Sequence, residues 1–288
     1  MSRQTKTDDN SGFTLMELLI AMAVGLIAMA VVFSVYIVQQ RSYRQQQSLL
    51  GAHQNLRGAL LVLEQQIRQA GFDPLGSGRF GITDVRRYDT LGTGPRADGQ
   101  PALFYTVDRD ENGAVDDRNH HRNAEHPNFR IRDDRNTGRI YLALDLGGGR
   151  QPLAENIQAI GLAYAVDRDR DGRPDTWEEE GHLIWAVDSD NDNRLDTHID
   201  TNNDGAIDEM DDSDGDHRIT AADGGVLNPP VPLDRICAVR VWLLAVARLP
   251  VKRPAGRFTY VVGDRLVTRS GGQEHFQLLE SIVQCRNL

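Results

Sequence analysis

Cysteine is scarce in this sequence, with only Cys237 and Cys285 among 288 residues. Two cysteines are too few for a disulfide-built scaffold or a zinc site made of cysteines, although they could form one bridge in an oxidising compartment. An excess of positive charge is also missing, because 42 acidic residues outnumber 32 basic ones and the net charge is -10. This balance argues against electrostatic capture of nucleic acid or anionic lipid, so we expect no nucleic-acid partner.

Motifs of the common enzyme classes are absent. The sequence has no G-x-S-x-G elbow, phosphate loop, dinucleotide fingerprint or context for a cysteine nucleophile. The segment 121–126 is one residue too long for an inverted zincin motif, and with His120 beside it we interpret it as a polar surface loop. We therefore predict that the protein is not an enzyme. Its 40% of apolar residues suffice for a sizeable core, which excludes collagen and whole-chain disorder.

The acidic residues are concentrated in one region. Between Asp188 and Asp216 the chain carries twelve carboxylates and one cation, Arg194, so the rest of the chain is close to neutral. Without cations, this region would repel itself and stay disordered.

The most apolar stretch, residues 13–38, contains a single charge, Glu17. As a helix it is about 39 Å long, enough to span the hydrocarbon core of a bilayer. A cleavable secretory signal usually has a shorter apolar region, an A-x-A-like site after it and no acid inside it, and this stretch fits that pattern poorly. Basic residues flank both ends equally, so the positive-inside rule gives no orientation.

A polar leader, residues 1–12, precedes this stretch, and the junction reads Gly12-Phe13-Thr14-Leu15-Met16-Glu17. It closely resembles the prepilin peptidase site of type IV pilins and type II secretion pseudopilins. The resemblance implies cleavage after Gly12, an N-methylated Phe13 and retention of the helix. A carboxylate in a bilayer is costly, so Glu17 needs a partner, for which the resemblance suggests the N-terminal amine of a neighbouring subunit. The alternative is an ordinary signal anchor with a tolerated acid.

An amphipathic pattern follows the apolar stretch. Apolar residues from Leu49 to Ala70 recur at steps of three and four, which predicts that the helix continues to about Gly71. A free-standing coiled-coil seam is the alternative. Residues 65–74 resemble the helix end in the PilW family of minor pilins, and residues 152–157 and the closing strands extend the likeness.

The region 72–288 has short apolar runs between Gly- and Asp-rich segments, which predicts strands. We expect them at residues 102–107, 139–144, 159–166, 182–187, 236–247, 257–262 and 276–283. The pilin-like resemblance implies an α+β fold, in which a long N-terminal helix (residues 13–71) packs on an antiparallel β-sheet. An acidic insert (188–227) and a stiff proline connector (228–232) interrupt the sheet. We interpret Cys237 and Cys285 as a disulfide staple, with two free core thiols as the alternative.

Five acidic loops share one spacing, which begins at Asp108, Asp167, Asp188, Asp200 and Asp212. Oxygen donors at positions 1, 3 and 5, a backbone carbonyl at 7 and acids at 9 or 12 suit Ca²⁺, which takes six to eight hard oxygens. The candidate calcium ligands, of which Arg173 and Ala206 offer a carbonyl, are Asp108, Asp110, Asn112, Asp116, Asp167, Asp169, Asp171, Arg173, Asp175, Glu178, Asp188, Asp190, Asp192, Asp196, Asp200, Asn202, Asp204, Ala206, Asp208, Asp211, Asp212, Asp214, Asp216 and Asp223.

These loops resemble EF-hand, dockerin and thrombospondin type 3 calcium loops, but they lack the flanking helix pair of an EF-hand. We therefore expect structural Ca²⁺ rather than a sensor switch, with solvated acidic loops as the alternative. Together the motifs predict a minor pilin of a type IV pilus, with the prepilin peptidase and other major and minor pilins as partners. We expect it in the inner membrane with a periplasmic domain, and later in the extracellular pilus. A type II secretion pseudopilin and a singly anchored calcium-dependent adhesin are the alternatives.

Overall fold

The structure is a computed structural model. It describes residues 14–91, 95–96, 98–115, 125–134, 139–147, 149–177, 181–248, 256–270, 272 and 274–288. Most of the histidine-containing segment 120–126 lies outside these residues. So do four of the predicted site residues, namely Gly12, Phe13, Asp116 and Glu178.

One helix, α1, covers Leu15–Gln69. The chain divides into two compact units, Met1–Gln47 and Ser48–Leu288, and α1 contributes residues to both. In the first unit, helix residues 15–38 are exposed. The helix is long and apolar enough to cross a membrane, with a mean hydropathy of 2.8 in an 18-residue window. The predicted apolar helix is therefore present.

The second half of α1 ends where the sequence predicts. Gly71 has a left-handed φ of 74°, and its N–H donates to the Thr106 carbonyl at 3.0 Å. A side chain at this position would strain the backbone and collide with Leu288, whose Cδ2 would lie 2.5 Å from the new Cβ. Glycine thus lets the chain leave the helix and turn directly against the C-terminal residues.

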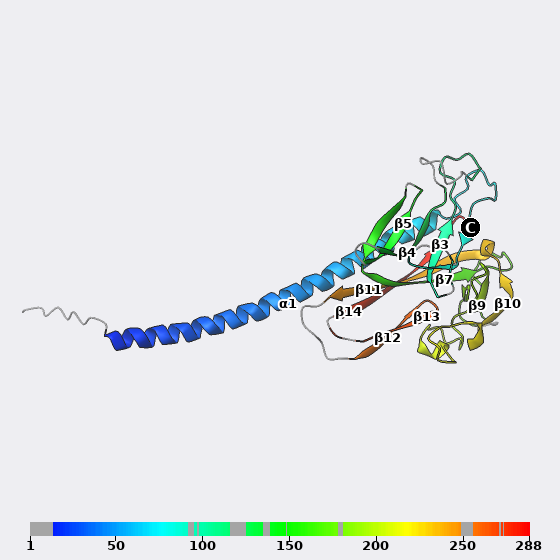
Figure 1. Cartoon of the computed structure of the whole chain (residues 1–288). Coiled ribbons are helices and arrows are strands. Elements are labelled where there is room, and N and C mark those ends of the chain that lie inside the picture. The colour runs from blue at the N-terminus through cyan, green and yellow to red at the C-terminus, as the bar shows by residue number, and fades with distance from the viewer. Residues whose placement is uncertain are drawn as a thin grey trace, which may run out of the picture. The chain divides into compact units, whose positions relative to one another are not determined.

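The second unit holds two six-stranded sheets and a hairpin, all with antiparallel pairing (Figure 1). The first sheet has the order β1-β3-β4-β5-β6, with β2 paired to β3, and comprises β1 Ile82–Asp84, β2 Arg87–Tyr88, β3 Gln100–Tyr105, β4 Asn128–Asp134, β5 Arg139–Asp145 and β6 Arg150–Glu155. The second has the order β10-β9-β8-β7-β11-β14 and comprises β7 Ile157–Val166, β8 Trp185–Val187, β9 Leu195–His198, β10 Val226–Val231, β11 Ile236–Arg248 and β14 Glu274–Gln284. The hairpin pairs β12 Arg257–Val262 with β13 Arg265–Ser270. Three short 3-10 helices, η1 Glu209–Asp211, η2 Ala221–Asp223 and η3 Leu233–Arg235, lie between the strands.

Two hydrophobic cores lie on the two faces of the second sheet. Successive side chains of a strand point to opposite faces, so Val239 and Val241 of β11 join the first core, and Trp242 and Leu244 join the second. The first core also takes in both sheets and the apolar stripe of α1, which is Leu56, Ala59, Leu63 and Ile67. The second core includes apolar residues of the β12–β13 hairpin. A long helix thus packs on antiparallel sheets, as the α+β prediction states.

The acidic region is less separate from the sheet than the sequence suggested. Each predicted strand overlaps an observed one, but β9 and the start of β10 lie within residues 188–227 and pair in the second sheet. The predicted proline connector, 228–232, is also mostly strand β10. This strand is the edge of the sheet, where a proline without an N–H is tolerated.

The predicted disulfide is not formed, because Cys237 and Cys285 are free thiols. The two residues lie opposite each other, with the Cys285 N–H donating to the Cys237 carbonyl at 2.9 Å. A bulge between Ile236 and Ala238 breaks the alternation of β11. Cys237 therefore packs against the second core, whereas Cys285 belongs to the first. The two cysteines thus contact the cores on opposite faces of the sheet.

We expect two thiols to be titrated in the unfolded, unreduced protein. Burial raises the pKa of the Cys285 thiol to about 12 and that of Cys237 to about 11, so the native protein should react far more slowly. Maleimide labelling with and without denaturant, followed by intact mass, measures both. A reduced sample is the control, and labelling that requires reduction would contradict the free-thiol structure.

Candidate functional site

The five acidic loops are one structural repeat. In each loop the fourth and sixth positions have left-handed backbone, with φ between 55° and 86°. These pairs are Glu111 and Gly113, Arg170 and Gly172, Asn191 and Asn193, Asn203 and Gly205, and Gly215 and His217. Because non-glycine residues rarely adopt this conformation, its recurrence at the same two positions reflects a common fold of the loop.

Hydrogen bonds wrap each loop around its own carboxylates. In the Asp188 loop, the Asp188 carboxylate accepts the N–H of Asp192 at 3.1 Å and of Asn193 at 2.8 Å. Asp190 also accepts from Asp192, and Asp192 accepts from Arg194 at 2.8 Å. In general terms, the side chain of the first residue accepts from the fifth and sixth N–H groups, that of the third from the fifth, and that of the fifth from the seventh. The loops at Asp108, Asp167 and Asp200 have the same hydrogen bonds. In the Asp212 loop the first carboxylate instead accepts from the fourth and sixth N–H groups, and the other hydrogen bonds are the same.

A further acid closes each loop by accepting the N–H of its second residue. Asp211 accepts from Thr201 at 2.7 Å, and Asp223 accepts from Ser213 at 2.8 Å, both from the twelfth position. The loops at Asp167 and Asp188 are closed from the ninth position instead, by Asp175 and Asp196. Asp175, itself a predicted ligand, therefore completes the Asp167 loop among the described residues, and the predicted Glu178 lies outside them.

Glu125 closes the Asp108 loop and was missed by the sequence. Its carboxylate accepts the Arg109 N–H at 2.7 Å, and the residue is fully buried. Its carboxylate lies within 4.8 Å of those of Asp108 and Asp110. Glu125 follows Asp108 by seventeen residues, which is outside the twelve-residue spacing of a calcium loop. In the sequence, Glu125 therefore stands out only as part of the histidine-containing segment. The only available signal was an acid next to strand β4.

Carboxylate oxygens converge in four loops to within 4.8 Å of one another. The three other groups are Asp167 with Asp169 and Asp175, Asp188 with Asp190 and Asp192, and Asp212 with Asp214 and Asp223. In the Asp200 loop, Asn202 accepts the Asp204 N–H and Asp208 caps η1 by accepting the Met210 N–H. Asp208 thus acts as the N-cap of η1. Several hard oxygens at this spacing form a donor set that fits Ca²⁺.

Several of these carboxylates are removed from solvent. Asp108, Asp200 and Asp211 are each no more than 2% exposed, and Asp188 is 5% exposed. Burial raises the pKa of Asp188 to about 6, although N–H groups of Asn193 and Asn191 oppose the rise. Burial also raises the pKa of Asp211. A nearby cation would stabilise the ionised form of both groups.

Each loop is fastened to another part of the second unit. Asn191 and Asn193 accept the N–H groups of Arg87 and Val85, at 2.6 and 3.0 Å, so the Asp188 loop joins the second sheet to the first. This contact accounts for Asn193 at the sixth position, where three of the other loops have glycine and the Asp212 loop has His217. Arg170 pairs with Asp234 at 3.2 Å.

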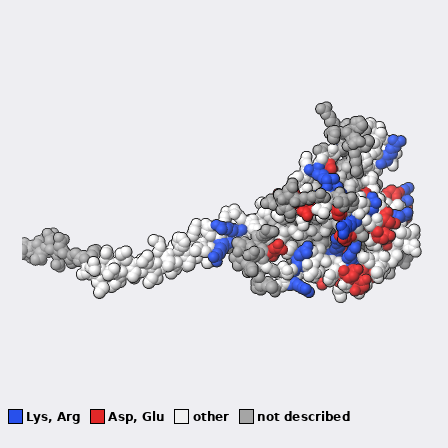
Figure 2. Space-filling model, viewed as in Figure 1, with Lys and Arg blue, Asp and Glu red and all other residues white. Residues whose placement is uncertain are grey.

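The remaining loops have comparable attachments. The Asp108 N–H donates to the Phe72 carbonyl beyond the end of α1 at 2.9 Å, and Asn203 accepts the His182 N–H at 3.0 Å. The His217 carbonyl accepts the Leu266 N–H from the β12–β13 hairpin at 3.0 Å. Figure 2 shows Asp and Glu side chains gathered on the globular part, with Lys and Arg among them. The loops therefore connect the elements of this unit.

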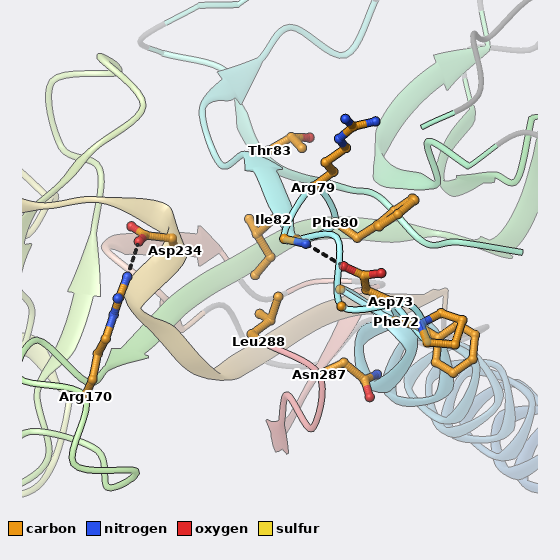
Figure 3. A pocket seen from close by; sticks show the side chains of 15 residues that line it. Phe72, Asp73, Arg79, Phe80, Ile82, Thr83, Arg170, Asp234, Asn287 and Leu288 are labelled. Atoms are coloured by element: carbon orange, nitrogen blue, oxygen red, sulfur yellow. Dashed lines mark hydrogen bonds and ion pairs between the residues drawn. The ribbon is translucent and has the colours of Figure 1, made fainter. Parts of the chain in front are cut away.

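A pocket of about 780 Å³ lies beside the turn that follows α1 (Figure 3). It is lined by residues of the segment 71–83, by the C-terminal Asn287 and Leu288, and by the Arg170–Asp234 pair. The Asp73 carboxylate beside it accepts from Ser77 and Gly78. Asp73, Arg170 and Asp234 thus already have partners within the fold.

Glu17 stands at the start of the described helix. Its carboxylate accepts both the N–H and the hydroxyl of Thr14 at 2.9 Å, and the Thr14 hydroxyl accepts the Glu17 N–H at 3.3 Å. This reciprocal arrangement is a capping box. Glu17 is exposed in the first unit, so its carboxylate remains accessible to a second partner.

Residues 8–33 match the family model of the prokaryotic N-terminal methylation motif. No curated protein matches the chain. Among solved structures, the chain is similar to a type IV-like pilin from Thermus thermophilus, with 13% sequence identity and a TM-score of 0.38. That match covers 82% of this chain and 97% of the other. The matched motif contains Gly12, Phe13 and Glu17, so the chain carries a type IV prepilin-like methylation motif at the start of its apolar helix.

Proposed function

We propose that the protein is a minor pilin of a type IV pilus, cleaved after Gly12 and methylated on Phe13. The observation that carries this proposal is the methylation motif over residues 8–33, which runs directly into α1. A structural subunit also suits the described acidic loops, whose carboxylates accept hydrogen bonds from their own backbone. A type II secretion pseudopilin has the same features and remains the second candidate.

The exposed apolar residues 15–38 support the proposed partners. Before assembly this surface suits the hydrocarbon core of the inner membrane, with the second unit in the periplasm. In an extracellular filament the same surface suits helices of other major and minor pilins. Prepilin peptidase is the proposed processing partner, and a singly anchored adhesin would keep its leader.

Structural Ca²⁺ is the second part of the proposal. The region from Asp188 to Asp216 carries a formal charge of -11, yet the loops there are folded around their own carboxylates. Bound Ca²⁺ would convert repulsion between these acids into cross-linking. Because each loop is fastened to a second element, the ions would hold the two sheets, the hairpin and the turn after α1 together.

The N-terminus of the mature protein tests the pilin proposal. In protein recovered from sheared filaments, we expect the first residue to be N-methylated Phe13, because the motif implies cleavage after Gly12. Mass spectrometry of the intact protein and its N-terminal peptide measures both changes. The membrane fraction of a strain without the peptidase is the control and should contain protein beginning in the leader. Filament protein that begins in the leader would contradict the proposal.

A further inference from the structure

Two arginines face each other where the Asp212 loop meets the β12–β13 hairpin. Arg218 and Arg265 form an isolated antiparallel bridge. The flanking hydrogen bonds run from the Ile219 N–H to the Asp264 carbonyl at 2.9 Å and from the Leu266 N–H to the His217 carbonyl at 3.0 Å. The bridge is therefore the non-hydrogen-bonded kind of pair, in which opposed side chains lie closest. Like charges in this position are destabilising unless they share a counter-ion.

The nearest acid is already used by a third arginine. Asp264, 1% exposed, pairs with Arg87, which is 3% exposed. The Arg218 Nη2 atom also lies 4.0 Å from the same carboxylate oxygen. The charges of Asp264 and Asp98 attract Arg265, while those of Arg87 and Arg218 repel it. Two guanidinium groups, those of Arg87 and Arg218, thus share one buried carboxylate, and the charge of that carboxylate also acts on Arg265.

Several donors in this cluster have no acceptor among the described residues. They are buried nitrogens: the Nε atoms of Arg87, Arg218 and Arg265, and the Nη2 atom of Arg218. Buried N–H groups are almost always paired, and a buried charge without a partner is costlier still. An anion with several acceptor oxygens would both pair these N–H groups and balance the excess of positive charge.

We propose that Arg87, Arg218 and Arg265 form a binding site for a small tetrahedral oxyanion of the sulfate or phosphate class. Planar guanidinium groups hold such oxyanions through paired, charge-assisted hydrogen bonds. The Arg218 side chain is 29% exposed, so the cluster borders solvent on that side, while its unpaired nitrogens are buried. A bound oxyanion would separate the two opposed arginines and join the Asp212 loop to the hairpin. Arg218 belongs to the Asp212 loop and Arg87 contacts the Asp188 loop, but the proposed site uses the guanidinium groups, none of which is a proposed calcium ligand.

Sulfate binding to the full chain in detergent micelles tests the site. We expect low-millimolar sulfate, at fixed free Ca²⁺ and matched ionic strength, to raise the thermal midpoint above that in chloride. Arg218→Gln should weaken the apparent sulfate affinity about tenfold or more, because it removes a charged donor. In chloride alone the same variant should be at least as stable as the wild type, since it relieves the repulsion with Arg265.

Arg173→Gln is the matched control. Arg173 occupies the same seventh position in the Asp167 loop, and its N–H donates to Asp171 as the Arg218 N–H donates to Asp216. The predicted calcium contact of Arg173 is its backbone carbonyl, which glutamine retains, so we expect this variant to keep the full response to sulfate. Equal midpoints in sulfate and chloride for the wild type would overturn the proposal. So would an unchanged response of Arg218→Gln, because stabilisation by sulfate would then reflect its general exclusion from the protein surface.

Discussion

Ca²⁺ at one hundred times its dissociation constant is expected to stabilise the full chain by about 2.7 kcal/mol for each site filled, because it binds only the folded loops. For a unit of this size, one site corresponds to a rise of about 5–10 °C in the thermal midpoint. Scanning calorimetry of chelator-treated protein in micelles, titrated with Ca²⁺, measures this effect. Mg²⁺ should have a smaller effect, since it demands octahedral geometry and gives up water reluctantly.

Variants with matched controls assign the effect to individual loops. Glu125→Gln should remove the response of the Asp108 loop, because it replaces the fully buried carboxylate that closes the loop. Glu111→Gln removes the same charge from the fourth position of that loop and should leave the response intact. Likewise Asp211→Asn should abolish the response of the Asp200 loop, whereas Glu209→Gln, two residues earlier, should not.

The change in midpoint on adding Ca²⁺ is the informative quantity, rather than the midpoint itself. Asp211 accepts hydrogen bonds from Thr201 and Asp208, so an amide there destabilises the loop even without metal. A calcium increment that is equal in Glu125→Gln and Glu111→Gln would show that Glu125 is no ligand. Identical midpoints with chelator and with saturating Ca²⁺ would show that hydrogen bonds alone hold the loops.

In the acidic loops, the spacing of residues predicts the local fold of each loop but not the acid that closes it. The first five positions are contiguous, and their N–H groups bond to the carboxylates of the same segment, so the spacing predicts the local fold. The closing acid is set by the path of the chain instead. It lies at the ninth position in two loops and the twelfth in two others, and it is Glu125 in the fifth. Tertiary structure brings Glu125 into place, so no fixed spacing could identify it.

Local backbone irregularities explain the errors in the fold prediction. The helix and the long strands have strong periodic patterns, and they lie where expected. The bulge at Cys237 adds one residue to β11 and places Cys237 against the second core while Cys285 belongs to the first, a change that no pattern of residue types reveals. The prolines of β10 read as a connector because the sequence does not show that this strand is an edge.

Gly12→Trp is expected to abolish processing altogether. Glycine has no side chain, so it permits close approach of the backbone at a cleavage site, which an indole would block. The protein should keep its leader, stay in the membrane fraction and be missing from sheared filaments, as measured by intact mass and immunoblotting. Gly25→Trp is the control, since Gly25 lies in α1 with no heavy atom within 4 Å of an added Cβ. It should be cleaved normally, and normal cleavage of Gly12→Trp would contradict the assignment of the site.

Glu17→Ala separates assembly from processing. We expect the variant to be cleaved after Gly12 yet to be missing from filaments, because the carboxylate is the proposed partner of a neighbouring N-terminal amine. Glu17 also accepts two hydrogen bonds from Thr14, so its loss could act through the start of the helix alone. Thr14→Val removes the hydroxyl but keeps the carboxylate, and it should still assemble. If Thr14→Val is lost from filaments as completely as Glu17→Ala, the Glu17 carboxylate acts by capping the start of α1. If Glu17→Ala assembles normally, the proposed contact between subunits is wrong.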